Sequence, residues 1–207
     1  MESRPAVRAA VGRPKEVTDL EILVVARRCF LERGAGVSAA EIARELGVSH
    51  TTLFNRFGSK EGLLIAALGP PEQVPWIDAL EAGPDDRSVR DQLVEHAQGM
   101  SEYFRDLQAG LGVLQAAGVH PGTACRGHAD GPVRAFRALV AWLERAQTQE
   151  RLARCDVETL ASTILVSLQG SAFAARVCGV PAGAEDPDRY VERFIDLLWA
   201  GIGPPEG

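Results

Sequence analysis

Short polar side chains that could bind nucleotides occupy residues 50–57, which read HTTLFNRF. If this segment is a helix, the outward positions are His50, Thr51, Thr52, Asn55 and Arg56. Such hydrogen-bonding groups match the donors and acceptors of base edges and the oxygens of phosphates. The segment therefore predicts a helix that lies in the major groove of duplex DNA. A helical hairpin without that role would tolerate long Glu and Lys side chains here equally well.

Two short helices around a glycine turn would position this surface. Ser38 begins the first helix with a capping-box spacing, and Gly47 follows that helix where a positive φ is needed. Ser49 caps the second helix, in which Leu53 and Phe57 face inward. This spacing predicts a helix-turn-helix.

Cationic residues flank the motif on both sides. Arg13 and Lys15 enclose Pro14, which keeps the chain extended as in arms that enter a minor groove. Ser59 caps a further helix, so that Lys60 and the helix N-terminus could meet one phosphate.

We expect three roles for the residues at the DNA. The groove-facing residues are His50, Thr51, Thr52 and Asn55; the residues at the phosphate backbone are Ser38, Phe54 and Lys60; the residues of the arm are Arg13 and Lys15. Ser49, which caps the helix, is also expected to bind DNA.

Residues from about Thr18 to Leu68 resemble the DNA-binding domain of the tetracycline-repressor (TetR) family of bacterial regulators. The matching residues are Ile22, Ala26, Phe30, Gly34, Ile42, Ala43, Gly47, Val48, Ser49, Thr52, Leu53, Phe54, Phe57, Lys60, Glu61, Leu63 and Leu64. The sequence departs from the family at Phe54, where Tyr is usual, and at Asn55, where His is frequent. The resemblance implies a cytoplasmic, homodimeric transcriptional repressor that a small-molecule effector releases from a palindromic operator.

Charge divides the chain unevenly, although its net charge of −6 does not indicate a nucleic-acid binder. Residues 1–62 carry 10 Lys and Arg against 8 Asp and Glu, and residues 63–207 carry 12 against 20. The net charges of +2 and −8 favour a mildly basic DNA-binding domain attached to an acidic domain. The expected divisions are a flexible basic arm (1–17), a helix-turn-helix domain (18–62) and a helical ligand-binding and dimerisation domain (63–207).

The acidic domain shows helical periodicity and no alternating β pattern longer than about four residues, so we expect an all-α fold. The Gly- and Pro-rich stretch 69–86 predicts a loop with one turn, and a break near 106–112 predicts two helices in place of one. The uncharged run 159–175 predicts a buried helix in place of a membrane span.

The last two long helices predict a dimer interface, because the final helix is apolar on more than one face. The expected interface residues are Leu168, Ser171, Ala175, Val191, Phe194, Ile195 and Leu198. The alternative is that these side chains are buried within one subunit.

By analogy with the family, the helices of residues 88–150 would enclose an effector pocket. Its candidate lining residues are Trp76, Met100, Phe104, Leu107, Leu111, Leu114, Phe136, Trp142 and Phe173. Such residues also serve as ordinary core. A largely apolar pocket favours an apolar or aromatic effector over a multiply charged one.

No catalytic motif, phosphate-binding loop or metal-binding motif occurs, so we expect no enzyme activity, cofactor or metal. His120, Cys125 and His128 lie close in sequence but lack a fourth ligand of suitable spacing. The four cysteines have no paired spacing and are expected to be reduced thiols. The alternatives to a regulator are a helical small-molecule-binding protein or enzyme with a vestigial helix-turn-helix, and an adaptor that binds a protein partner.

Overall fold

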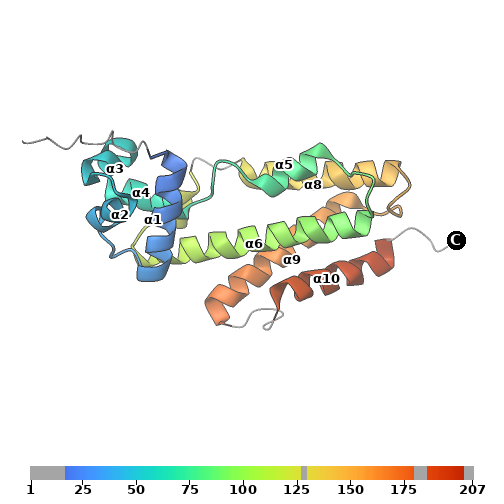
Figure 1. The fold of residues 1–207 in the computed structure, drawn as a ribbon. Helices are drawn as coiled ribbons and strands as arrows, with labels where there is room; N and C mark the ends of the chain where they lie inside the picture. The colour runs from blue at the N-terminus through green and yellow to red at the C-terminus, as the bar shows by residue number, and fades with distance from the viewer. Residues whose placement is uncertain (1–16, 127–129, 180–185, 203–207) are drawn as a thin grey trace, which may run out of the picture. The chain divides into compact units, whose positions relative to one another are not determined.

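Helices form all the regular structure of residues 17–126, 130–179 and 186–202, which are the residues that the computed structural model describes (Figure 1). The predicted all-α fold is confirmed. The chain divides into two units, which we call the head (to Ala67) and the body (from Leu68). The sequence placed this division after residue 62. Arg27 of the head donates a hydrogen bond to the carbonyl oxygen of Ala67 (3.2 Å), the last residue of the head.

The head is built from capped helices. They are α1 (Asp19–Arg33), α2 (Ala39–Leu46), α3 (His50–Phe57) and α4 (Lys60–Leu68). Ser38 forms the predicted capping box at α2, and Gly47 ends α2 with a φ of 70°. Ser49 accepts a hydrogen bond from the backbone N–H of Thr52 and so caps α3, as predicted. Val17, which the sequence assigned to the flexible arm, is buried.

One carboxylate joins α1 to α2. Glu45 accepts hydrogen bonds from Arg28, from Arg33 (3.1 Å) and from the thiol of Cys29 (3.2 Å). The hydrogen bond from Cys29 is the largest cause that lowers the pKa of Glu45, and burial raises the pKa of the Cys29 thiol. A buried thiol with a raised pKa is a poor nucleophile, so Cys29 belongs to the structure of the head.

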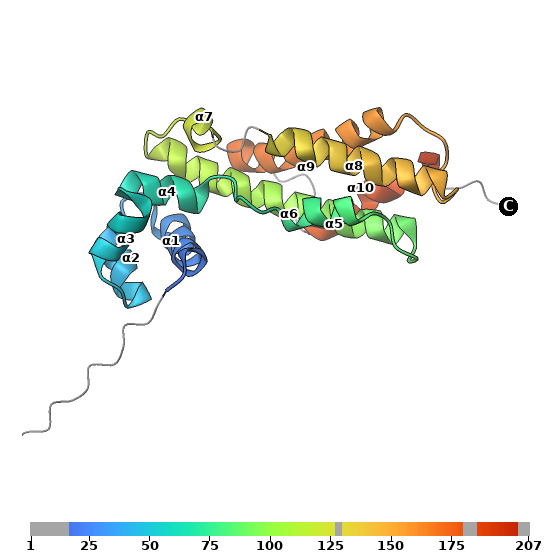
Figure 2. The ribbon, with the colours of Figure 1, turned by 90° about the horizontal axis from the view of Figure 1, so that it is seen from above.

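The body contains six helices within the described residues. They are α5 (Pro75–Ala82), α6 (Val89–Ala116), α7 (Pro121–Ala124), α8 (Gly131–Thr148), α9 (Val157–Cys178) and α10 (Pro187–Ile202). Helix α6 packs along α9 and α10, whereas α5 lies against α8 and α6 (Figure 2). Their buried side chains form one core around Leu93, Met100, Leu139, Trp142 and Ile164.

Two predictions for the body are wrong. The stretch expected to be a loop contains α5, which begins at Pro75 and buries Trp76, Ile77 and Leu80. Helix α6 is unbroken through residues 106–112. The glycine at 110 serves a close approach, because a Cβ there would lie 2.3 Å from the carbonyl oxygen of Leu68.

Arginines hold α5 and the loop after it in the body. Arg134 of α8 donates to Asp78 (2.7 Å) and Glu81 (2.7 Å) of α5. The hydrogen bond from Arg134 lowers the pKa of the Glu81 carboxyl. Arg145 donates to the carbonyl oxygen of Leu80 (2.8 Å) and so satisfies the C-terminus of α5.

Helix α9 is the one helix of the described residues whose length and hydropathy would suit a membrane span. Leu160, Ile164 and Leu168 bury one side of it in the core of the body. The core helix of a soluble protein passes the same test of length and composition.

Candidate nucleic-acid interface

The orientation of α3 is set by Leu53. This side chain is 1% exposed, and Phe57 on the same side of the helix is half-buried. His50, Thr51 and Asn55 are exposed. Helix α3 therefore turns its apolar side into the head and presents the predicted imidazole, hydroxyl and amide groups to solvent.

Hydrogen bonds at the start of α3 orient two of the residues predicted to bind DNA. The hydroxyl oxygens of Ser49 and Thr52 lie 2.9 Å apart, and the Ser49 oxygen also accepts from the Thr52 backbone N–H (3.2 Å). Thr52 is half-buried, whereas Ser49 is exposed. The cap that begins α3 thus fixes these hydroxyls in one direction, which removes part of the entropy cost of binding a partner.

The sequence also grouped Arg56 with the outward residues, but this guanidinium is engaged within the head. Arg56 donates to the backbone oxygen of Val17 and pairs with the carboxylate of Asp19 (2.8 Å) at the start of α1. Arg56 therefore joins the end of α3 to the start of α1.

Phe54 forms an edge-to-face pair with His50 across one turn of α3. The ring centroids are 5.4 Å apart, and Phe54 is 36% exposed. The pair places the imidazole against an aromatic ring and leaves an apolar surface beside the polar groups. An exposed ring of this kind could contact a deoxyribose or a thymine methyl group.

The predicted backbone contacts lie at the starts of α2 and α4. Ser38 donates its hydroxyl to Glu41 (2.7 Å), a bond that lowers the pKa of that carboxyl. The Ser59 hydroxyl accepts from the Gly62 N–H (2.9 Å) and caps α4 as predicted. Lys60 is half-buried at the first position of α4. Arg13 and Lys15 lie outside the described residues.

Five cations of the head, apart from Arg27, differ in whether they form ion pairs. Arg28, Arg33 and Arg56 form ion pairs with Glu45 or Asp19. Arg44 and Lys60 form no ion pair with any residue that the structure describes. Charges without a protein partner are available to phosphate oxygens. The sequence analysis missed Arg44 because nothing in its spacing separates it from the paired arginines.

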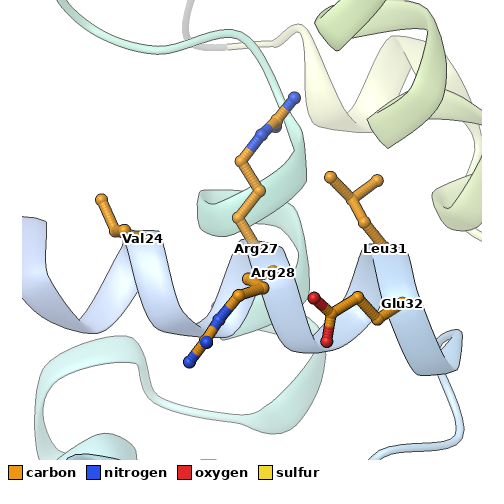
Figure 3. A pocket seen from close by; sticks show the side chains of 5 residues that line it. All are labelled: Val24, Arg27, Arg28, Leu31 and Glu32. Atoms are coloured by element: carbon orange, nitrogen blue, oxygen red, sulfur yellow. The ribbon is translucent and has the colours of Figure 1, made fainter.

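A shallow groove on α1 was not predicted. Its lining comprises Val24, Arg27, Arg28, Leu31 and Glu32, and Figure 3 shows Val24 and Leu31 on either side of Arg27. Arg28 pairs with Glu45, so this groove shares a side chain with the joint between α1 and α2. None of the residues predicted to bind an effector lines it.

Residues of the predicted effector pocket have different surroundings. Met100, Leu114 and Trp142 are fully buried, and Trp76 is nearly so. Phe104, Leu107, Leu111 and Phe136 are half-buried. Phe173 is 49% exposed and lies under the guanidinium of Arg176, 5.5 Å from its ring centroid. Phe173 therefore lies on the surface of α9 and does not line the interior between α5, α6 and α8.

The residues of the predicted dimer interface also differ in how deeply they are buried. Leu168, Val191 and Ile195 are almost completely buried within one chain, so they offer no surface to a partner. The interpretation of these three as interface residues is corrected, because α9 turns Leu168, and α10 turns Val191 and Ile195, into the core of the body. Ser171, Ala175, Phe194 and Leu198 remain half-buried. The exposed apolar side chains of α9 and α10, which the sequence analysis missed, are Val166, Val177 and Leu197, together with Phe173.

The metal hypothesis concerns a loop that is only partly described. His120 is exposed, and its Nδ1 accepts a hydrogen bond from the Gly122 N–H (3.0 Å). Cys125 is half-buried, and His128 lies outside the described residues. Among residues 17–126, 130–179 and 186–202, no three His, Cys, Asp or Glu side chains gather as metal ligands would.

Models of known protein families match both the head and the body. The model of bacterial regulatory proteins of the tetR family matches residues 22–67, and that of the AefR-like transcriptional repressor C-terminal domain matches residues 97–201. The chain belongs to the TetR family. It is a DNA-binding regulator of transcription, in agreement with the sequence-based expectation. Members of the TetR family are cytoplasmic proteins that act as dimers and respond to effector ligands.

Individual relatives of this TetR-family chain are distant. The HTH-type transcriptional repressor BdcR of Escherichia coli (strain K12) is 30% identical over 113 residues, which are 53% of this chain and 56% of BdcR. The aligned region thus spans little more than half the length of that relative.

Solved structures share the fold over most of the chain. A putative TetR-family regulator from Mesorhizobium loti has a TM-score of 0.59 at 19% identity, over 89% of this chain and 96% of its own. A putative TetR-family regulator from Rhodococcus sp. has a TM-score of 0.57 at 21% identity, over 86% of this chain and 95% of its own.

Proposed function

We propose that this chain is a homodimeric repressor that binds a palindromic operator and is released by a small-molecule effector. The observation that carries the proposal is the exposed face of α3. His50, Thr51 and Asn55 are short, hydrogen-bonding and exposed, on a helix that Leu53 anchors and Ser49 caps. These are the properties of a recognition helix in a helix-turn-helix.

Contacts to bases and to phosphates come from different parts of the head. Asn55 and His50 offer groups that can pair with adenine or guanine edges in the major groove. The phosphate contacts come from Ser38 and Arg44, at the start of α2 and within it, and from Lys60 at the start of α4. The exposed ring of Phe54 also lies at the DNA backbone. Arg13 and Lys15 extend the contact into the adjacent minor groove.

A homodimer follows from the apolar side chains that one chain leaves in water. Val166, Phe173 and Val177 of α9 are 67%, 49% and 57% exposed, and Leu197 of α10 is 75% exposed. A second copy would cover these side chains, with Ser171, Ala175, Phe194 and Leu198 at the edges of the contact. Sedimentation at micromolar concentration should give a dimer, and a monomer would remove this part of the proposal.

Release by an effector requires two states of the dimer. In the DNA-bound state, the two α3 helices enter successive major grooves about 34–36 Å apart. An effector that binds better to a state with another spacing lowers the occupancy of the operator by its differential affinity. Helix α4 runs from Lys60 in the head to Leu68, the first residue of the body, so it carries the change between the units. A crosslink that holds the two heads at the operator spacing should abolish induction.

Salt-dependent binding to duplex DNA tests the proposal through Lys60. We expect Lys60→Ala to weaken binding to all sequences alike, because a phosphate contact carries no sequence information. The slope of log affinity against log salt should fall by about one unit. Fluorescence anisotropy with a cognate and a scrambled duplex measures both quantities.

The matched control for Lys60→Ala is Arg154→Ala in the body. Arg154 is exposed and forms no ion pair with any described residue, so its removal changes the net charge equally. The control should leave the slope unchanged. If Lys60→Ala lowers affinity for the cognate duplex only, Lys60 reads sequence and does not bind phosphate.

A further inference from the structure

Helix α1 carries an apolar face that no described residue covers. Leu20 is 72% exposed, Val24 is 60% exposed and Leu31 is 38% exposed. The three side chains share one side of the helix, because they are spaced by four and seven residues. The shallow groove beside Arg27 lies on the same face (Figure 3). A contiguous exposed face of this kind indicates that another segment packs against it.

One charge of the groove has no partner within the described residues. Arg28 pairs with Glu45, and Arg27 donates to the carbonyl oxygen of Ala67. Glu32 forms no hydrogen bond or ion pair with any residue that the structure describes. The groove therefore combines exposed apolar side chains with an unpaired carboxylate. It fits a segment that carries a single cation among apolar side chains.

A segment of this composition precedes α1 in the same chain. Residues 6–11 read AVRAAV, in which Arg8 lies between two valines and three alanines. The other cations of residues 1–16 each adjoin a proline. Within residues 1–16, which lie outside the described part of the chain, Arg8 is thus the cation that has apolar neighbours on both sides.

The chain before α1 is long enough to reach the groove. It joins the head at Val17, which is buried and accepts a hydrogen bond from Arg56 at its backbone oxygen, so the point of attachment is fixed. Glu32 lies about 22 Å from this point along α1, at a rise of 1.5 Å per residue. An extended chain from Val17 back to Arg8 spans about 28 Å. A chain that reverses its direction at Val17 can therefore place Arg8 beside Glu32.

We propose that residues 7–11 dock on the exposed face of α1 in the DNA-free protein, with Arg8 paired with Glu32. The valines and alanines of this segment cover the apolar side chains of α1. The segment leaves α1 when the preceding and following cations enter a minor groove, so its competition with DNA rests on the proposed function. Docking raises the apparent Kd for DNA by the reciprocal of the undocked fraction.

Trypsin cleavage after Arg8 measures the docking. The full-length protein is treated without DNA, and the fragment that begins at Ala9 is followed by mass spectrometry. Because the protease cleaves the undocked segment, cleavage should be at least about threefold slower than in a peptide of residues 1–17. In the double variant V24Q/L31Q, the rate should come within about twofold of the rate in the peptide. Equal rates in the unaltered protein and the peptide would overturn the proposal.

Val133→Gln is the matched control for the double variant. Val133 is an apolar side chain of α8 with 48% exposure, and its replacement should leave the rate of cleavage unchanged. Sedimentation of the same samples tests the other occupant, a second copy of the chain. If V24Q/L31Q lowers the sedimenting mass and leaves cleavage after Arg8 unchanged, a second copy covers the face and the proposal is overturned.

Glu32→Gln tests the ion pair, because Gln keeps the shape of the side chain and removes its charge. Cleavage after Arg8 should become about two- to fivefold faster, the range expected for one exposed ion pair. The control is Glu158→Gln on α9, since Glu158 is exposed and forms no ion pair with any described residue. An equal change in both variants would contradict the pairing of Arg8 with Glu32.

DNA binding by the same variants separates this inference from the proposed function. V24Q/L31Q should bind duplex DNA more tightly by the same factor by which its cleavage accelerates, because both quantities report the undocked fraction. Faster cleavage with unchanged affinity would overturn the competition with DNA. Failure of every variant to bind duplex DNA at low salt would count against the proposed function, whereas the cleavage rates would still decide the docking.

Discussion

Replacing Leu53 by Asp is expected to unfold the head and abolish binding to duplex DNA. Leu53 is 1% exposed, and Ile22, Phe30 and Ile42 of the same small unit are fully buried. An ionised carboxylate there would have no partner, and its burial costs several kcal/mol. That cost is comparable with the total stability of about 5–15 kcal/mol of a typical domain. Hydrogen–deuterium exchange should show loss of protection throughout α1, α2 and α3.

The matched control for Leu53→Asp is Asn55→Asp, which introduces the same group two residues further along α3. Asn55 is exposed, so its replacement should leave amide protection in the head unchanged. It should still weaken DNA binding, because a carboxylate at the groove repels phosphates. Retention of protected amides and DNA binding in Leu53→Asp would show that α3 does not face inward through Leu53.

Gly110→Ala is expected to lower the free energy of unfolding of the body by about 1–3 kcal/mol, the usual cost of forcing extra atoms into a packed interior. The added Cβ would lie 2.3 Å from the carbonyl oxygen of Leu68 and 3.1 Å from its carbonyl carbon. These are backbone atoms, so Leu68 and α6 would have to separate. Denaturant unfolding followed by tryptophan fluorescence reports on the body, because Trp76, Trp142 and Trp199 all lie in it.

Two other glycines of the long helices are controls for Gly110→Ala. A Cβ on Gly112 would contact only the flexible side chain of Arg176, at 3.5 Å, and a Cβ on Gly170 would meet nothing within 4 Å. Alanine at either position should leave stability unchanged or raise it by up to about 1 kcal/mol, the gain in helix propensity. If all three variants behave alike, the close approach of Leu68 to α6 does not depend on Gly110.

Features of the head that depend on neighbours in sequence could be predicted from the sequence. Ser38, Gly47 and Ser49 act within three or four residues, and the structure shows each cap where the spacing indicated it. Leu53 follows from the same periodicity. These predictions succeed because capping and helix amphipathicity depend on residues that are close together in the sequence.

Partners far apart in the sequence could not be predicted. The helical spacing places Arg56 on the outward face, but in the structure Arg56 pairs with Asp19, which is 37 residues away. Glu45 likewise forms ion pairs with Arg28 and Arg33 only because the fold brings α1 and α2 together. Tertiary packing decides which charged side chains form ion pairs. The sequence alone therefore did not single out Arg44.

The helix break and part of the dimer interface were predicted wrongly because a glycine, or an apolar helix face, is compatible with more than one structure. A break was predicted near residues 106–112, whereas Gly110 in this stretch allows a backbone contact inside an unbroken helix. Val191 and Ile195 were assigned to a dimer interface, whereas they fill the core of one chain. An amphipathic pattern shows that a face is buried and does not show what buries it.

Selection of bound duplexes from a random pool at low ionic strength tests the central claim, that two α3 helices read DNA together. The account predicts a palindromic consensus whose half-site centres lie about 10 base pairs, or a multiple of that, apart. Asn55→Ala should relax the preference at symmetric positions of both half-sites. Recovery of no enriched sequence, or of a single unrepeated half-site, would contradict it.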